Sequence, residues 1–277
     1  MSTSIAFIGG GNMASSLIGG LISSSEQTAS ILVAEPNAEQ REQLALQFNV
    51  QTTGDNNQTL KADVVVLAVK PQLLQVVCRA LSDTLQQSDK QPLFISIAAG
   101  VRSADIDRWL GGNQAIVRCM PNTPSLLQTG ATGLYANQHV DDSQKTLAEN
   151  ILRAVGITLW VNKEAELDAV TAVSGSGPAY FFLLMEAMQR AGIKLGLEAE
   201  TAEKLVLQTA LGAALMADNS DVDVATLRAR VTSKGGTTEQ AIKSFQNAHF
   251  EKLVENALKA ANERSQSLAD ELSKDPS

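Results

Sequence analysis

The residues best suited to chemistry lie at the start of the chain, in a glycine-rich turn. The apolar run Ile5-Ala6-Phe7-Ile8 leads directly into Gly9-Gly10-Gly11-Asn12-Met13-Ala14. A short strand that turns through G-x-G-x-x-A into an apolar helix is typical of a dinucleotide-binding unit, because glycine permits the tight turn and lets the backbone approach a pyrophosphate. The first hypothesis is therefore a redox enzyme.

The elements around this turn favour the same interpretation. A helix predicted over residues 13–24 would direct its free N–H groups and its positive dipole end towards a diphosphate. A second hydrophobic strand, over residues 31–34, ends in Glu35, where a unit of this kind holds the adenosine ribose hydroxyls. The predicted cofactor-binding residues in this region are Gly9, Gly11, Asn12, Met13 and Glu35.

The first part of the chain alternates strands with helices, which predicts an α/β domain of the Rossmann type with a doubly wound parallel sheet over residues 1–162. Its further strands are predicted at residues 64–69, 93–97, 115–118 and 158–161. Its further helices are predicted at residues 38–48, 73–84, 104–110 and 144–155.

From about residue 163 the pattern is helical, rich in alanine and leucine, and without a convincing strand. We expect an all-helical C-terminal domain over residues 163–277, with helices at 178–191, 198–218, 227–231, 238–245 and 250–272. A helical domain of this size often completes its core against a second copy, so a homo-oligomer with a dimer as its basic unit is expected.

The whole-chain composition excludes several classes of protein. The chain has 277 residues, is 44% hydrophobic and carries a net charge of −8, and its longest apolar run, at 179–185, is too short to span a bilayer. Neither membrane insertion nor secretion is indicated, and no basic stripe predicts a nucleic-acid partner. Cys78 and Cys119 have no C-x-x-C or C-x-x-H partner, so we expect reduced core cysteines and a cytoplasmic location.

Further segments carry a family resemblance. They are Ala68-Val69-Lys70-Pro71, Ser96-Ile97-Ala98-Ala99-Gly100-Val101, Arg118-Cys119-Met120-Pro121-Asn122-Thr123-Pro124, the segment Asp168–Tyr180 with Ser174-Gly175-Ser176-Gly177-Pro178 inside it, and the segment Val231–Thr238, which ends in Ser233-Lys234-Gly235-Gly236-Thr237-Thr238. With the N-terminal turn, they resemble the signature blocks of pyrroline-5-carboxylate reductase, the last enzyme of proline biosynthesis, in the expected order over residues 5–245. The resemblance implies reduction of 1-pyrroline-5-carboxylate to L-proline with NADPH or NADH, a dimeric basic unit, and a decamer as a larger assembly.

Several residues at predicted strand ends border the cofactor if the resemblance holds. They are Ala68, Lys70, Pro71, Ala98 and Asn122. Ligands of open α/β sheets bind at the carboxyl edge, where Lys70 leaves its strand, although a lysine there can also be merely solvated. The prolines around Asn122 can wall the nicotinamide or simply make a rigid turn.

Two later segments are the expected substrate site. Ser176 precedes an apolar helix that begins with Pro178, so an N-cap role suffices for it, while the resemblance places it beside the substrate. Thr237 followed by Gln240 fits a capping box, and a small carboxylate can dock at such a helix start. The resemblance implies that Ser233, Gly236 and Thr237 bind the substrate carboxylate and that the Thr238 hydroxyl lies near the ring nitrogen.

The chemistry of a cyclic imine fits these residue types. A protonated imine is already electrophilic at C5, so hydride transfer requires mainly positioning and charge complementarity, with Thr238 and Ser233 as the catalytic candidates. His139 and His249 read as surface residues, and no cluster has metal-ligand spacing, so no metal is expected. The substrate is expected at the domain junction, between the nicotinamide and the Ser233–Thr238 loop.

Two features complicate the resemblance. Many relatives have proline where this chain has Lys234, so the loop is expected to be less rigid. A carboxylate at Glu35 suits the ribose 2′-hydroxyl of NADH and would repel the 2′-phosphate of NADPH, although Arg41 lies close enough along the next helix to reach a phosphate. We expect NADPH to be usable and NADH to be at least competitive.

Two other functions remain open at this point. A hydroxy-acid dehydrogenase of the same two-domain group would need a base for the hydroxyl proton, and residues 178–189 carry only Glu186. A cofactor-binding protein without catalysis, acting as a redox sensor or a scaffold, would leave the Ser233–Thr238 loop without a task.

Overall fold

A computed structural model describes residues 3–24 and 30–274. The chain divides into two compact units, one made of residues 1–176 and 260–277 and the other of residues 177–259. These contacts place the boundary after residue 176, and not after residue 162 as expected, because residues 163–176 and the end of the chain pack with the first unit.

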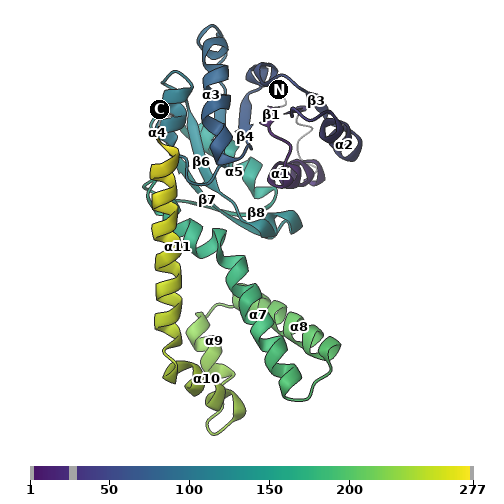
Figure 1. Ribbon diagram of the computed structural model, residues 1–277, viewed down its shortest axis with the longest axis vertical. Helices are drawn as coiled ribbons and strands as arrows, with labels where there is room; N and C mark the ends of the chain where they lie inside the picture. The colour runs from purple at the N-terminus through teal and green to yellow at the C-terminus, as the bar shows by residue number, and fades with distance from the viewer. Residues whose placement is uncertain (1–2, 25–29, 275–277) are drawn as a thin grey trace. The chain divides into compact units, whose positions relative to one another are not determined.

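The first unit is built on an eight-stranded sheet with the order β3-β2-β1-β4-β5-β6-β7-β8 (Figure 1). Its strands are β1 (Ser4–Ile8), β2 (Ser30–Ala34), β3 (Gln51–Thr53), β4 (Val64–Leu67), β5 (Leu93–Ser96), β6 (Ile116–Met120), β7 (Gly130–Ala136) and β8 (Gly156–Trp160). Strands β1 to β6 are parallel, which confirms the doubly wound α/β fold, and the order reverses between β1 and β4.

The far edge of the sheet differs from the prediction of a purely parallel sheet. Strand β7, which the sequence did not reveal, pairs antiparallel with β6, and β8 pairs parallel with β7. The connection from β6 to β7 holds only the short helix η2 (Thr123–Leu127). A parallel pair needs a long crossover, so a connection of this length favours an antiparallel neighbour.

Helices cover both faces of this sheet. They are α1 (Asn12–Ser23), α2 (Ala38–Phe48), η1 (Asn56–Lys61), α3 (Pro71–Gln86), α4 (Ser103–Trp109), α5 (Asp142–Arg153), α6 (Glu166–Val170) and η3 (Thr171–Gly175). Alternate residues of β4 belong to two separate apolar clusters, with Val64 and Val66 in one and Val65 and Leu67 in the other. A strand that is buried on both faces reads as a continuous apolar run, as this one does.

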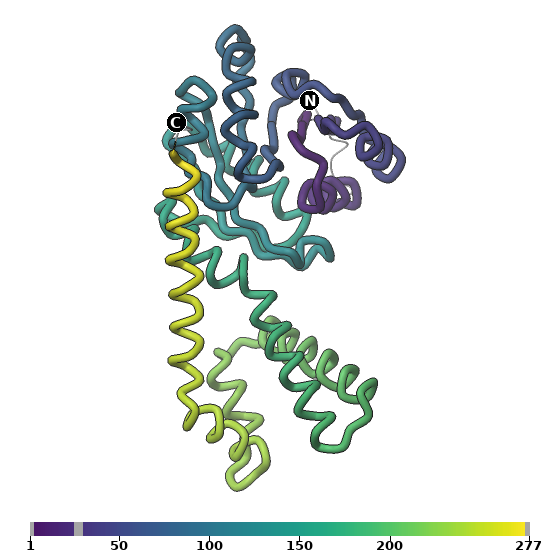
Figure 2. Tube along the Cα trace, in the orientation of Figure 1, coloured from purple at the N-terminus to yellow at the C-terminus, as the bar shows by residue number. Residues whose placement is uncertain are grey.

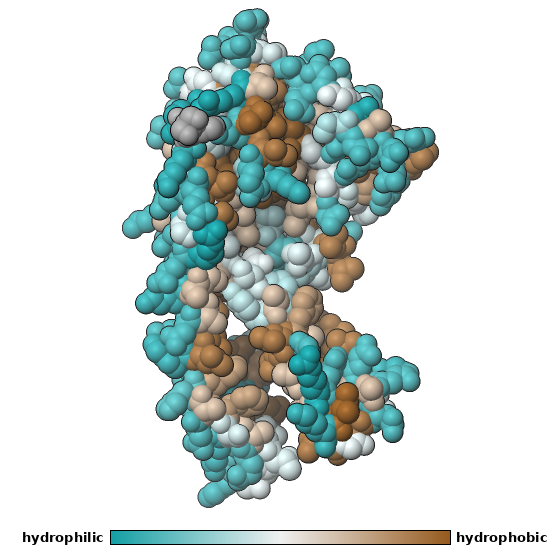
Figure 3. All heavy atoms as spheres, viewed as in Figure 1, coloured by the Kyte–Doolittle hydropathy of each residue, from teal (hydrophilic) through white to brown (hydrophobic). Residues whose placement is uncertain are grey.

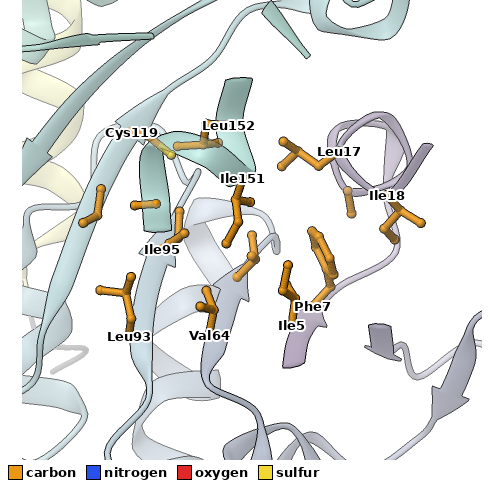
Figure 4. Packing of buried hydrophobic residues seen from close by; sticks show 14 of the residues in the cluster. Ile5, Phe7, Leu17, Ile18, Val64, Leu93, Ile95, Cys119, Ile151 and Leu152 are labelled. Carbon is orange, nitrogen blue, oxygen red and sulfur yellow. The ribbon is translucent and has the colours of Figure 1, made fainter. Parts of the chain in front are cut away.

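Figure 4 shows the first of these clusters. Leu17 of α1 and Ile151 of α5 point towards Phe7 of β1 and Ile95 of β5, and all four side chains are buried. This packing fixes the start of α1 against the ends of the central strands, where the predicted cofactor residues lie.

The second unit is entirely helical within residues 177–259. It contains α7 (Gly177–Lys194), α8 (Ala199–Asp218), α9 (Val224–Arg230), α10 (Thr237–Asn247) and the beginning of α11 (Phe250–Leu272). Helices α7 and α8 lie side by side (Figure 2). Large apolar side chains such as Phe181, Phe182 and Leu211 are exposed, and Figure 3 shows hydrophobic residues at the surface of these helices.

The end of α11 packs within the first unit. The Ser265 hydroxyl donates a hydrogen bond to Asp168 at 2.6 Å, and a side chain added at Gly100 would lie 3.2 Å from Leu268. Gly100 has φ +75°, so glycine is required there for the backbone as well. Among the described residues, no helix is long and apolar enough to cross a membrane.

Candidate functional site

The glycine turn has the geometry that the motif predicts. Gly9 has φ +97°, and a Cβ atom there would lie 2.6 Å from the carbonyl oxygen of Ala68, so only glycine fits. Gly11 is the N-cap of α1 and makes no side-chain cap, and a Cβ atom there would meet no atom within 4 Å. The N–H groups of Asn12 and Met13 therefore open the helix without a protein cap, which suits an anion.

Gly10, between these two glycines, is fastened to the β2–α2 segment through both of its backbone groups. Its N–H donates to Glu35 Oε2 at 3.0 Å, and its carbonyl accepts a hydrogen bond from Gln40 Nε2 at 2.7 Å. A Cβ atom at Gly10 would lie only 2.5 Å from Leu44 Cδ1. These two hydrogen bonds, the Gly10 clamp, hold the turn in place, and the sequence alone predicts neither of them.

Both carboxylate oxygens of Glu35 accept hydrogen bonds from backbone N–H groups. Its Oε1 accepts from the Asn37 N–H at 3.0 Å, in addition to the Gly10 bond to Oε2. Arg41 turns back on the same segment, and its Nη1 donates to the carbonyl oxygens of Glu35 at 2.7 Å and Pro36 at 2.9 Å. The predicted ribose ligand is therefore also a structural partner of the glycine turn.

The other predicted cofactor residues of the first unit lie along one edge of the sheet. Register pairs Ile8 with Leu67 and Leu67 with Ser96, so Gly9, Ala68 and Ala98 follow neighbouring parallel strands at their carboxyl ends. Lys70 is the N-cap of α3 and Pro71 is its first residue, as proline prefers. This edge, beside the reversal of strand order between β1 and β4, is where open α/β sheets bind ligands.

Asn122 lies at the end of β6 and bridges two segments of the first unit. Its Oδ1 accepts from the Ala131 N–H at 2.9 Å, and its Nδ2 donates to the Ser174 carbonyl at 3.1 Å. In a regular helix that carbonyl would accept from the residue four positions later, which is Pro178 and has no N–H. The Asn122 amide therefore takes the place of the missing donor.

Ser176 lies directly before α7 without the extended backbone of an N-cap, so the alternative reading of this residue as an N-cap is not supported. Its backbone is helical, with φ −88° and ψ −16°, and its N–H donates to Thr171 at 2.8 Å. Residues Thr171–Gly175 form a π-helical segment, η3, which joins α6 to α7 without an interruption that needs a cap. Short π segments of this kind occur frequently at functional sites.

The Ser233–Thr238 loop, in the second unit, also differs from its predicted capping. Gly236 is the N-cap of α10, with φ −82° and ψ 171°, and no side chain caps the helix. The predicted capping box of Thr237 and Gln240 was therefore wrong, because Thr237 is already inside the helix. The Gly236 N–H donates to the Ser233 carbonyl at 3.0 Å, which leaves the first-turn N–H groups of Thr237 and Thr238 as the available donors.

Outside these segments, the ionisable groups of the described residues form no metal-binding or nucleophilic centre. Within the described part of the chain, no three His, Cys, Asp or Glu side chains form a group that could hold a metal. Both cysteines are buried and unpaired, and burial raises the pKa of Cys78 to about 12 and that of Cys119 further. Neither thiol is available as a nucleophile.

Comparison with known proteins identifies the family. Residues 164–268 match the family model "Pyrroline-5-carboxylate reductase dimerisation", and residues 4–100 match "NADP oxidoreductase coenzyme F420-dependent". The chain is 56% identical to the pyrroline-5-carboxylate reductase of Pseudomonas aeruginosa over 269 residues, or 97% of each protein. The chain belongs to the pyrroline-5-carboxylate reductase family. This confirms the resemblance read from its motifs.

Solved structures agree with this assignment. The pyrroline-5-carboxylate reductase of Coxiella burnetii is 48% identical, with a TM-score of 0.92 over 97% of this chain and 99% of that one. The enzyme of Plasmodium falciparum, solved with NADP bound, is 30% identical, with a TM-score of 0.83 over 96% of this chain and 98% of that one. The match to a dimerisation model supports the predicted homo-oligomer.

Proposed function

We propose that this chain reduces 1-pyrroline-5-carboxylate to L-proline by hydride transfer from NADPH or NADH, as the final step of proline biosynthesis. The observation that carries the proposal is the family match over nearly the whole chain. It is supported by a glycine turn of cofactor-binding geometry in one unit and an uncapped helix start in the other.

The residues of the first unit fit a nicotinamide dinucleotide. Gly11 leaves open space where a Cβ would be, and the uncapped start of α1 offers backbone donors to a diphosphate. Gly10, Asn12 and Gln40 line a polar hollow of about 250 Å³ beside this turn. Gly9, Gly11, Asn12 and Met13 would hold the diphosphate, and Glu35 the adenosine ribose. The bound cofactor supplies the hydride.

The strand-end residues would complete the cofactor site. Ala68, Lys70, Pro71 and Ala98 belong to the same sheet edge as the glycine turn, so they are the proposed neighbours of the rest of the cofactor. Asn122 would act there through its position at the end of β6, because its amide is engaged with Ala131 and Ser174.

The start of α10 would bind the substrate carboxylate. The N–H groups of Thr237 and Thr238 and the Ser233 hydroxyl are the proposed donors, and Gly236 allows close approach because it has no side chain. Ser176 is proposed to line the substrate site by family resemblance alone. Hydride adds to C5 of the protonated imine, the C=N electron pair moves to nitrogen, and the amine keeps its proton while the Thr238 hydroxyl orients it.

A dimer is the proposed basic unit, and a decamer the proposed larger assembly. In the second unit, Leu184, Ile242, Phe245 and Phe250 line an apolar groove of about 680 Å³, which a second copy can fill. The two buried thiols are compatible with a reducing compartment, and we propose that the protein is cytoplasmic.

Replacement of Thr238 by alanine tests the substrate half of this proposal. The variant is expected to lose about tenfold or more in kcat/KM for 1-pyrroline-5-carboxylate, since one hydrogen bond to a charged group contributes about 1.5–3 kcal/mol. Binding of NADPH, measured by its fluorescence, should not change. An unchanged kcat/KM would contradict the proposed role and favour a cofactor-binding protein with another task.

A further inference from the structure

The loop before α10 contains a well-defined β-turn. The Gly236 N–H donates to the Ser233 carbonyl at 3.0 Å, and Gly235, the third residue of the turn, has φ +76°. A positive φ at this position is the mark of a type II turn, which therefore requires glycine or asparagine there. Proline is favoured at the second position, and this chain has Lys234 there.

Type I and type II turns differ by the orientation of their central peptide. In the type I form the third residue has φ near −90°, and in the type II form it has φ near +80°, because the peptide between the second and third residues is flipped. Glycine at the third position tolerates both forms. Lysine at the second position does not fix φ as proline would, so a contact to the central peptide would favour one form over the other.

Glu239 provides a contact to that central peptide. Its Oε2 accepts a hydrogen bond from the Gly235 N–H at 2.8 Å, and this N–H belongs to the peptide that would flip. Its Oε1 lies 3.2 Å from Lys243 Nζ, one turn further along α10, so both carboxylate oxygens are engaged. The hydrogen bond from Gly235 lowers the pKa of Glu239 below the ordinary value for a glutamate.

We propose that Glu239 is a positioning residue that holds the Ser233–Gly236 turn in its type II form and so aims the start of α10 at the substrate carboxylate. The proposal rests on the proposed function, because it takes this helix start as the carboxylate site. In this chain the hydrogen bond that the Gly235 N–H donates to Glu239 supplies the restraint that proline at position 234 would otherwise contribute.

The carboxylate of Glu239 also brings a negative charge near the proposed anion site, so repulsion is the opposite possibility. Two variants separate the effects. Glu239→Ala removes both the acceptor and the charge, whereas Glu239→Gln keeps an oxygen that can accept from Gly235 and removes only the charge. Glu200→Ala is the matched control, since Glu200 also lies in the first turn of a helix and pairs with a lysine one turn on, Lys204.

The kinetic experiment measures KM for 1-pyrroline-5-carboxylate and for NADPH in the full-length enzyme. Glu239→Ala should raise the substrate KM by about five- to tenfold, the loss expected for one partly solvated hydrogen bond to a charged acceptor. The KM for NADPH should remain within about twofold, as should both constants in Glu200→Ala. Glu239→Gln should resemble the wild type. A substrate KM that stays unchanged or falls in Glu239→Ala would overturn the proposal.

Amide hydrogen exchange of the ligand-free protein gives a readout that does not depend on activity. Exchange at Gly235 should be faster in Glu239→Ala than in the wild type and unchanged in Glu200→Ala, and equal exchange in all three would overturn the restraint. A wild-type protein that fails to turn over 1-pyrroline-5-carboxylate would instead overturn the proposed function. Hydrogen exchange alone would then decide whether Glu239 restrains the turn.

Discussion

Replacement of Glu35 separates two roles that its carboxylate combines. One oxygen holds the Gly10 N–H at 3.0 Å, and the other holds the Asn37 N–H at 3.0 Å. The same carboxylate is the proposed ligand of the adenosine ribose. Glu35→Ser removes the clamp and the charge together, whereas Glu35→Gln removes the charge and keeps one oxygen as an acceptor for Gly10.

The expected magnitudes follow from these contacts. A hydrogen bond to a charged acceptor contributes about 1.5–3 kcal/mol, and partial solvent exposure places the Gly10 bond near the lower value, about tenfold in affinity. Like charges about 4 Å apart repel by about 1 kcal/mol in water and more near a protein surface, so removal of the carboxylate should favour NADPH over NADH by about five- to tenfold.

Steady-state kinetics at saturating imine test this prediction. Glu35→Gln should shift the ratio of kcat/KM values towards NADPH with little common loss. Glu35→Ser should show the same shift and, in addition, a higher KM for both cofactors. A ratio that stays unchanged in both variants would refute the ribose assignment. Equal KM values in the two variants would refute the clamp.

Three further predictions concern hydrogen bonds between residues that lie far apart in the sequence. Gln40→Ala, which frees the glycine-turn carbonyl, should raise KM for NADPH several-fold without changing kcat, while Glu42→Ala, on the same helix but outside the lining of the hollow, should leave both unchanged; a KM that also stays unchanged in Gln40→Ala would contradict the clamp. Asn122→Asp keeps the acceptor for β7 and places an oxygen against the π-segment carbonyl, so it should lower the melting temperature more than Asn122→Ala does, and the reverse order would refute the bridge. Hydrogen bonds from Lys90 and then from Ser4 lower the pKa of Asp63 to about 2. The charged Asp63 therefore stabilises the folded protein fully above about pH 4, and this contribution is lost as the pH falls through 2. The difference in melting temperature between Asp63→Asn and the wild type should disappear over that range, and a difference that persists at low pH would contradict the assignment.

Much of the fold could be predicted because its signals are local. The bounds of α2 and α11 match the predicted ranges, 38–48 and 250–272, and α2 begins where the Asn37 side chain caps the Gln40 N–H. Strands β3 and β7 were missed. β3 has three residues and β7 contains two glycines, so their formation depends on pairing with neighbours far along the chain.

The candidate site shows the same division between local and distant information. Gly9 and Gly11 follow from their spacing, since the backbone conformation that they permit is a local property. The bonds from Gln40 to Gly10 and from Asn122 to Ser174 depend on tertiary placement, which no spacing reveals. The capping box failed because Gly236 takes the N-cap position that Thr237 was expected to fill, and the alternative N-cap reading of Ser176 does not fit its helical backbone.

The most direct test of the central claim is the oxidation of NADPH and of NADH by the purified protein with 1-pyrroline-5-carboxylate, followed by the nicotinamide absorbance and by analysis of the product. The account predicts turnover that depends on the imine and forms one L-proline per cofactor oxidised. Cofactor binding without turnover, or turnover without L-proline, would contradict it.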